Sequence, residues 1–525
     1  MCVAFGRLAW IPWIRPVQAL GFAEPAPGLG VDRVALHSDI RHFVLHRYKS
    51  QCGLSVDDMG VMVFQGGIQQ NNYSTDTEIL FKQEPYFHYL FGVEEPGCIA
   101  LLDVRSARSI LFLPRLEADH AVWMGETPTL AGYRKKYGVQ EVYWTDELAP
   151  PTLHLLSGVN SDSGLLLPPA AFPGLEAFRC ECESLFPVVT DARVYKGPRE
   201  LEVLRYCCRV AARSHIKLMQ SVKPGMYEYE CESAFLNDIY ASGACRFAPY
   251  TPILGSGPNS AVLHYGHSGA PHARRIRCGD LLLADCGAEY YQYGSDLTLT
   301  YPVSGTFTPQ QRTVYEAVLG ALEAVEAAMR PGVPWWQMHL LAEREILGAL
   351  TRAGLLRGAL EEQMAARLGA LFMPHGLGHF LGKQTHDVGG YIPGWTPERS
   401  SEPGLKYLRT ARVLAEWMVI TVEPGCYFVP ALLEPAFKDE KLAPFLVESE
   451  LRAYMTFGGV RLEDNVVVTA NGAERLVVLP RSVADVERVL AGGAWDIAEP
   501  EREEGEGADD EKEAESVDAV NGGAD

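Results

Sequence analysis

The chain has 525 residues, of which 47% are hydrophobic and 22% are charged, as in an ordinary globular protein. This length exceeds what one compact core accommodates, so we expect at least two domains. The formal net charge of −21 argues against nucleic acids and anionic membranes as partners, and no apolar run approaches the roughly 18 residues that a membrane-spanning helix needs.

Residues 1–31 form an N-terminal extension rich in Ala, Pro, Gly and Trp. Its apolar run LAWIPWI is short for a secretory signal and is interrupted by Pro12 and Arg15. We therefore expect no targeting segment and a cytoplasmic protein. The twelve cysteines are scattered and include the adjacent pair Cys207 and Cys208, a pattern that favours free thiols over a disulfide framework.

Residues 32–190 alternate strands and short helices, the pattern of an N-terminal α/β domain. Within this domain we expect the side chain of Trp123, in the segment HAVWMG, to be packed. Four runs read as buried strands: Val61–Gln65, Cys98–Asp103, Ser109–Leu113 and Gly164–Leu167.

Residues 191–496 begin with helices and continue with strands that carry candidate ligands. Amphipathic spacing predicts helices over Arg199–Ser221, 309–330 and 335–354. This order is typical of an α+β domain whose curved antiparallel sheet holds metals on its concave face.

Residues 497–525 form an acidic tail, with twelve acidic and two basic residues from Glu499 onward; it cannot bury enough apolar surface to become ordered.

The segment Leu281–Tyr301 carries two aspartates, Asp285 and Asp296, among residues that favour β-structure. A hairpin that turns near Tyr290 and Tyr291 would place the aspartates opposite each other, with Cβ atoms about 4.5–5.5 Å apart. Carboxylates that close need a shared proton or a cation, and two divalent metals about 3.5–4 Å apart would fit. The alternative is a strand pair with two surface aspartates.

Three later segments supply matching chemistry. The Gly-rich MPHGLGHFLG contains His375 and His379, the run ITVEPG contains Glu423, and GGVRLEDNVVV contains Glu463 beside Arg461. With the two aspartates, His379, Glu423 and Glu463 give four carboxylates and one imidazole. Oxygen-rich sites of this kind suit Mn²⁺, Mg²⁺ or Co²⁺ better than a thiolate-seeking metal.

The order and spacing of these residues resemble the metallopeptidases of the pita-bread fold. The motifs PHGLGHFLG, HDVGGY, LRTAR, TVEPG and GGVRLED are similar to those of the Xaa-Pro dipeptidase (prolidase) family, and the likeness runs from Asp32 to Gly492. The resemblance implies an N-terminal α/β domain followed by a C-terminal pita-bread metallopeptidase domain, in a homodimer. It also raises an alternative for Trp123, as a lid over the neighbouring subunit's active site.

By the resemblance, two Mn²⁺ ions per subunit are expected, with Co²⁺, Mg²⁺ or Zn²⁺ as alternatives. Asp285 would be a terminal ligand, Asp296 and Glu463 would bridge the ions, and His379 and Glu423 would complete the second ion. Glu423 would also move a proton to the leaving nitrogen. The resemblance further implies that His264 and His386 act in catalysis and substrate binding.

The remaining cleft residues expected by motif are Tyr250, Arg409 and Arg461. A planar guanidinium at Arg409 would bind the free carboxylate of a dipeptide bidentately and so measure substrate length. In one place the sequence departs from the family's pattern: Ala415-Glu416-Trp417 stands where a Pro-Gly turn normally precedes the strand bearing Glu423.

The leading prediction is a dinuclear-metal dipeptidase that uses a metal-activated hydroxide to cleave the bond before a C-terminal proline. The closest alternative is an Xaa-Pro aminopeptidase acting on longer peptides. A methionine aminopeptidase, a phosphoesterase and a non-enzymatic binding protein that retains the fold are weaker alternatives. We expect neither nucleic acid nor membrane as a partner.

Overall fold

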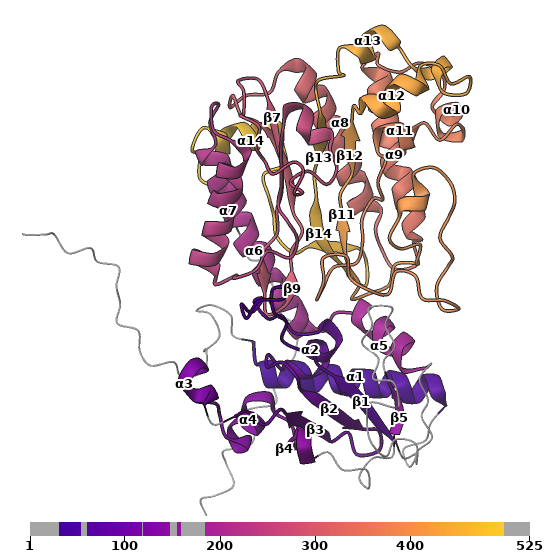
Figure 1. The fold of residues 1–525 in the computed structure, drawn as a ribbon. Coiled ribbons are helices and arrows are strands. Elements are labelled where there is room, and N and C mark those ends of the chain that lie inside the picture. Colours follow the sequence, from indigo (N-terminus) through magenta and orange to yellow (C-terminus); the bar gives the residue numbers. More distant parts are fainter. Residues whose placement is uncertain (1–30, 54–59, 118, 148–154, 159–183, 498–525) are drawn as a thin grey trace, which may run out of the picture.

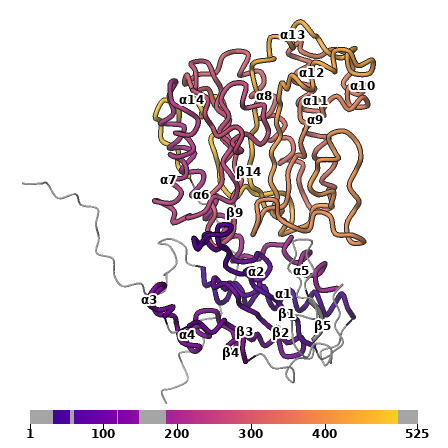
Figure 2. Tube along the Cα trace, viewed as in Figure 1, coloured from indigo at the N-terminus to yellow at the C-terminus, as the bar shows by residue number. Residues whose placement is uncertain are grey.

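The computed structural model describes residues 31–53, 60–117, 119–147, 155–158 and 184–497. It has two parts stacked end to end (Figure 1); the colours in Figure 2 show that the lower part is N-terminal and the upper part C-terminal. The predicted strand Gly164–Leu167 lies outside the described residues, as do residues 1–30 of the extension and 498–525 of the tail. The predicted domain boundaries stay predictions.

The N-terminal part is built on a five-stranded sheet in the order β4-β3-β2-β1-β5. Strand β2 pairs antiparallel with β1 and β3, whereas β1/β5 and β3/β4 are parallel. Two predicted strands are confirmed as β1 and β3, and the third begins one residue later, as β2. The strands are β1 Val61–Gln65, β2 Ile99–Asp103, β3 Ser109–Leu113, β4 Glu141–Trp144 and β5 Leu155–Gly158.

Helices complete this mixed α/β part. The first, α1, begins at a cap in which Asp32 accepts from the amides of Val34 (2.9 Å) and Ala35 (3.0 Å), and it ends at Gly53, whose φ of +62° suits glycine. The helices are α1 Arg33–Cys52, α2 Pro85–Phe91, α3 His120–Met124, α4 Leu130–Tyr137 and α5 Leu185–Val194.

The prediction that Trp123 is packed is wrong. Its side chain is 80% exposed, and its neighbours Val122 and Met124 are 79% and 64% exposed. The reason is the position of α3, a five-residue helix without a buried residue that stands away from the sheet (Figure 1). The alternative, a lid over a neighbouring subunit's site, stays a prediction.

The C-terminal part opens with long helices, as predicted. Helix α6 contacts β8 and β9, and α8 contacts α9 and the strands β11, β12 and β13. The helices are α6 Pro198–Ser221, α7 Glu228–Gly243, α8 Pro309–Ala328, α9 Trp335–Arg352, α10 Leu360–Ala365, α11 Gly369–Phe372, α12 Pro430–Ala436, α13 Glu448–Arg452 and α14 Val483–Leu490.

All strand pairs among the described residues of this part are antiparallel, which confirms the predicted α+β class. An isolated bridge between Thr298 and Glu463 joins the group β6, β7 and β10 to the later strands. The strands are β6 Ile253–Ser256, β7 Leu281–Asp285, β8 Glu289–Tyr290, β9 Tyr293–Gly294, β10 Thr298–Pro302, β11 Val419–Val422, β12 Gly425–Tyr427, β13 Gly459–Arg461, β14 Asp464–Val468 and β15 Ala473–Arg475.

The predicted hairpin exists, but its register differs by two residues. Asp285 lies opposite Thr298 rather than Asp296. The turn falls at Tyr291 and Gln292, which both adopt positive φ, 50° and 58°, as in the type I′ turns that match the twist of paired strands. Asp296 therefore lies just outside the ladder of β10.

The turn before β11 has a residue in a conformation that favours glycine, although that residue is Trp417. Trp417 has φ +69°, and the amide of Met418 donates to the carbonyl of Ala415 (3.3 Å), so Trp417 occupies the position that favours glycine in a type II turn. Two further backbone bonds hold it there: Trp417 N donates to Val468 O (2.9 Å), and Lys196 N donates to Trp417 O (2.8 Å).

We predict that Trp417→Gly stabilises the protein by about 1 kcal/mol, because a left-handed conformation costs a residue with a Cβ about 1–2 kcal/mol. Urea unfolding should show a higher midpoint. The matched control is Glu416→Gly, at a residue without positive φ, which should lower stability by about 0.5–1 kcal/mol. Lower stability of Trp417→Gly would mean that the indole, 43% exposed, contributes more than the backbone strain costs.

Candidate metal centre and substrate cleft

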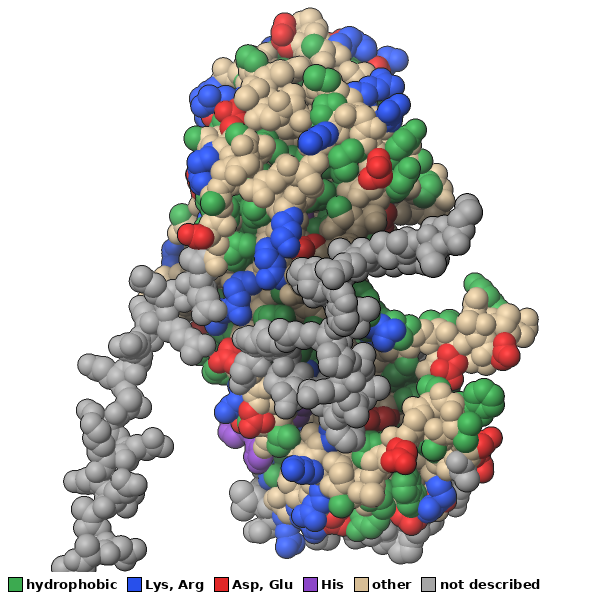
Figure 3. Space-filling view, turned by 90° about the vertical axis from the view of Figure 1, so that its left-hand side faces the viewer, with side chains coloured by type: hydrophobic (Ala, Val, Ile, Leu, Met, Phe, Trp, Pro, Cys, Tyr) green, Lys and Arg blue, Asp and Glu red, His purple; other side chains and the backbone are tan. Residues whose placement is uncertain are grey.

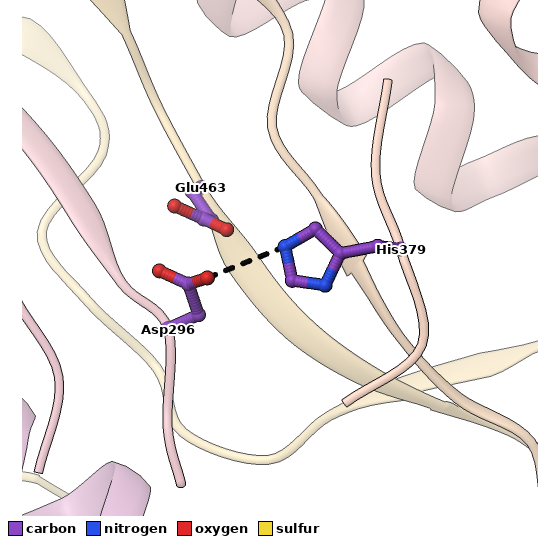
Figure 4. A group of neighbouring side chains, drawn as sticks. All are labelled: Asp296, His379 and Glu463. Carbon is purple, nitrogen blue, oxygen red and sulfur yellow. Dashed lines mark ion pairs between the residues drawn. The ribbon is translucent and has the colours of Figure 1, made fainter. Parts of the chain in front are cut away.

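Three buried side chains from different elements converge in the C-terminal part. Asp296 precedes β10, His379 lies in the loop after α11, and Glu463 lies between β13 and β14. One ligand atom from each lies within 4.8 Å of the other two, and Figure 4 shows the three side chains turned toward one another. His379 Nε2 is 3.3 Å from Asp296 Oδ2 and 3.3 Å from Glu423 Oε1. Four of the five predicted ligands therefore meet here.

Backbone contacts and a ring proton orient His379. Its amide donates to Thr421 Oγ1 (3.0 Å), and its carbonyl accepts from the amide of Thr421 (2.9 Å), which ties the loop to β11. Its Nδ1 donates to the carbonyl of Phe380 (3.0 Å). Nε2, which faces the carboxylates of Asp296 and Glu423, is therefore the ring atom that can bind a metal once it has lost its proton.

Asp296 is positioned by a side chain instead of a strand ladder. Its amide donates to Asn465 Oδ1 (2.9 Å), and Asn465 Nδ2 donates to its carbonyl. Asn465 is on β14, two residues after Glu463. The same stretch of chain therefore positions the carboxylates of both Asp296 and Glu463. Nothing in the sequence pattern assigned a role to Asn465.

Glu463 has one oxygen bonded and one without a partner. Thr298 Oγ1 donates to Oε2 (2.7 Å), whereas Oε1 is buried and makes no hydrogen bond with the described residues. A buried carboxylate oxygen without a partner is costly. Because one oxygen of Glu463 also lies within 4.8 Å of ligand atoms of Asp296 and His379, this carboxylate suits a divalent cation.

The pKa values agree with a site built for cations. Burial and the charge of Asp285 raise the pKa of Asp296 to about 6. Burial and the charge of Asp296 raise the pKa of Glu463 well above its ordinary value. Burial lowers the pKa of His379, but its hydrogen bond to Asp296 and the charge of Glu423 outweigh burial and raise it. A bound cation would relieve the repulsion among these carboxylates.

Asp285 is held next to this group by two other side chains. Arg461 Nη2 contacts Oδ2 (2.5 Å), and Tyr250 Oη donates to Oδ1 (2.7 Å). Burial and the charge of Asp285 raise the pKa of Tyr250 well above its ordinary value, so its hydroxyl stays protonated. Arg461 also donates to Tyr427 Oη (2.8 Å), so its guanidinium is engaged by the protein. The ligand role of Asp285 and the substrate-binding roles of Tyr250 and Arg461 stay predictions.

The predicted substrate residues share one large cleft with these groups. The cleft has a volume of about 1660 Å³, and its walls include residues 79–85 of the N-terminal part. It is lined by all ten predicted site residues: Tyr250, His264, Asp285, Asp296, His379, His386, Arg409, Glu423, Arg461 and Glu463.

His386, one of the predicted substrate-binding residues, lies beside the candidate ligand His379. Its ring packs edge-on against His379, with centroids 4.5 Å apart. Burial, followed by the charges of His379, Arg409 and His264, lowers the pKa of His386 to about 3, so the imidazole stays neutral. Arg409 makes no hydrogen bond or ion pair with any described residue, which leaves its guanidinium available to a ligand.

His375 was singled out in the sequence but received no role. It lines the cleft, with Nδ1 3.8 Å from Glu423 Oε2 and Nε2 3.0 Å from Tyr427 Oη. Burial lowers its pKa to about 4. Its position four residues before His379, in the same Gly-rich motif, could have identified His375 as a residue of the site.

Comparison with known proteins agrees with this geometry. The sequence model of metallopeptidase family M24 matches residues 202–470, and that of the aminopeptidase P N-terminal domain matches residues 45–162. The Xaa-Pro dipeptidases of Homo sapiens and Rattus norvegicus are 48% and 47% identical to this chain, over 82% of this chain and 89% of theirs.

Two more distant relatives bear the aminopeptidase name. A probable Xaa-Pro aminopeptidase of Tuber melanosporum is 34% identical over 82% of this chain and 92% of its own length. The structure of Pseudomonas aeruginosa aminopeptidase PepP superposes with a TM-score of 0.70 at 28% identity, over 86% of this chain and 98% of that one.

Proposed function

The chain belongs to metallopeptidase family M24, and we propose that it is a metallo-dipeptidase that hydrolyses Xaa-Pro dipeptides before a C-terminal proline. One observation carries the proposal: Arg409, which has no hydrogen-bond or ion-pair partner among the described residues, lies in the same cleft as the Asp296, His379 and Glu463 group. A carboxylate receptor next to the hydrolytic centre suits a substrate that ends there. The higher identity to dipeptidases than to aminopeptidases disfavours the aminopeptidase alternative.

The residues fit a divalent metal, and we propose two Mn²⁺ ions per subunit. Asp296, His379, Glu423 and Glu463 would hold them, with Asp285 as the fifth ligand. When bound, the metal supplies Lewis-acid chemistry, activating water and polarising the scissile carbonyl. Four oxygen donors and one imidazole suit Mn²⁺, and Co²⁺, Mg²⁺ and Zn²⁺ are the alternatives to test.

The chain's own groups bind the substrate and move the proton. Arg409 grips the C-terminal carboxylate, and His264 and the neutral imidazole of His386 offer hydrogen bonds to the dipeptide. Glu423 takes the proton from water at its carboxylate and passes it to the leaving imino nitrogen. Thr421 Oγ1, which donates to Glu423 Oε1 (3.1 Å), keeps that carboxylate in place.

We predict that exhaustive dialysis against EDTA abolishes Gly-Pro hydrolysis and that Mn²⁺ restores it. Circular dichroism should show that most of the fold is retained. Protons compete with metal for carboxylates and imidazole, so metal affinity should fall as pH decreases through about 6, where apo Asp296 titrates. Full activity with metal analysis showing an empty site would exclude the proposal.

Substrate length separates the two peptidase hypotheses. The dipeptidase should cleave Gly-Pro in preference to a Gly-Pro-Xaa tripeptide, with and without added Mn²⁺. Equal turnover of both peptides would instead favour the aminopeptidase.

A homodimer and a cytoplasmic location are further parts of the proposal. The exposed apolar side chains of α3 support the dimer, because such groups are usually covered by a partner.

None of the nine described cysteines is in a disulfide, as in a reducing compartment. Among the described helices, none is long and apolar enough to cross a bilayer, and acidic and basic side chains are mixed over the face in Figure 3.

A further inference from the structure

A buried lysine lies in the loop between the two histidines of the site. Residues 379–386, here called the histidine loop, run from His379 to His386, and Lys383 stands between them with only 2% of its surface exposed. Burial lowers the pKa of Lys383 well below its ordinary value. Removing an amine from water is costly unless its hydrogen atoms find partners, so its contacts are informative.

Lys383 finds a partner on each side. Its Nζ lies 2.7 Å from Nδ1 of His88 and donates to the carbonyl of Tyr291 (3.2 Å). It also lies 3.9 Å from the ring centroid of Tyr293, a cation–π distance. The hydroxyl of Tyr293 donates in turn to buried Glu200 (2.9 Å). The amine thus has two hydrogen-bond partners and one aromatic ring against it.

His88 is suited to accept this bond. Burial, followed by the charge of Lys383, lowers the pKa of His88 well below its ordinary value, so its imidazole is neutral and Nδ1 can accept. Its ring also packs edge-on against Tyr291, with centroids 4.6 Å apart. Lys383 therefore contacts both His88 and Tyr291, whose rings already pack against each other.

The partners belong to different parts of the chain. His88 is on α2, within the region that matches the aminopeptidase P N-terminal domain, whereas Tyr291 and Tyr293 are on the β8–β9 hairpin. In Figures 1 and 2, β9 lies where the two parts of the molecule meet. A hydrogen bond from Gly294 N to Gly382 O (3.0 Å) attaches the hairpin to the histidine loop a second time.

We propose that Lys383 is a positioning residue for the substrate: it fastens the histidine loop to the N-terminal part through His88, and so fixes the imidazole of His386 in the cleft. The role rests on the proposed function, in which His386 contacts the dipeptide. The N-terminal part would then set the substrate affinity of a site whose candidate ligands all lie in the C-terminal part.

The test uses Lys383→Met, which keeps most of the side chain's length and removes its amine. Amide exchange of residues 380–386 should become faster, because the loop loses a tie to the rest of the fold. In the Mn²⁺-loaded enzyme, KM for Gly-Pro should rise about tenfold, while kcat falls less than about threefold and the metal content is unchanged.

A second variant makes the test independent of one substitution. His88→Leu removes the acceptor and should raise KM similarly, and the double variant should be no worse than Lys383→Met alone, since both changes delete one contact. The control is Lys217→Met, which deletes an exposed lysine paired with Asp238 at 2.5 Å and should alter neither exchange of the loop nor KM.

Two outcomes would overturn the proposal. Unchanged exchange of residues 380–386 in both variants would show that the contact does not restrain the loop. A lower melting temperature with unchanged KM would show that Lys383 serves stability alone. If the wild-type enzyme did not cleave Gly-Pro, the proposed function would fail instead, and the exchange measurement, which needs no substrate, would still decide whether Lys383 restrains the loop.

Discussion

Asp296→Asn is expected to lower kcat/KM for Gly-Pro by at least about 10²-fold, the scale of losing a strong electrostatic contact in an active site. Asparagine keeps the shape of the side chain and removes its charge. The carboxylate lies 3.3 Å from His379 Nε2 and beside Glu463, so its loss weakens the hold on any cation that these groups share. Kinetics and metal content of the purified variant measure the effect.

The control for this substitution is Asp439→Asn. Asp439 is exposed and accepts from the amides of Lys441 (2.8 Å) and Leu442 (3.1 Å), which an asparagine oxygen also accepts. This variant should keep both activity and metal. If Asp296→Asn behaved like the control and retained two metals, Asp296 would not be a bridging ligand.

The sequence predicted the elements of the fold better than their pairing. Strands β1 and β3 and helices α6, α8 and α9 match the predictions within two residues, because each carries an uninterrupted apolar period. The predicted pita-bread architecture is confirmed by the superposition on aminopeptidase PepP. The hairpin register was wrong because Tyr291 and Gln292 are not residues that mark a left-handed turn, so the sequence did not reveal where the chain reverses.

The candidate site shows the same division between local and long-range information. His379, Glu423 and Glu463 stood in recognisable motifs, and the structure brings them together with Asp296. Asn465, by contrast, contacts Asp296 from 169 positions away, and Lys383 contacts His88 from 295 positions away. No local pattern reports contacts of that separation, so these supporting side chains became visible only in the folded chain.

Amidating the C-terminal carboxylate of Gly-Pro is expected to lower kcat/KM by roughly 30-fold to a few thousandfold. The amide removes the partner of Arg409 and leaves a guanidinium unpaired in the cleft, a loss of roughly 2–5 kcal/mol, at about 1.4 kcal/mol per tenfold change. Arg409→Ala should cost a similar factor on free Gly-Pro. Steady-state kinetics of both enzymes on both substrates measure the effect.

The decisive quantity is how the two changes combine. Arg409→Ala should cost almost nothing further on the amide, because mutation and amidation delete the same interaction, and such pairs are non-additive. Lys406→Ala is the control: Lys406 also lines the cleft, three residues before Arg409, so its removal tests whether any nearby positive charge suffices. It should change both substrates by the same small factor. If instead the losses from Arg409→Ala and amidation multiplied, and the tripeptide were cleaved as well as the dipeptide, Arg409 would not bind the carboxylate and the aminopeptidase would become the better hypothesis.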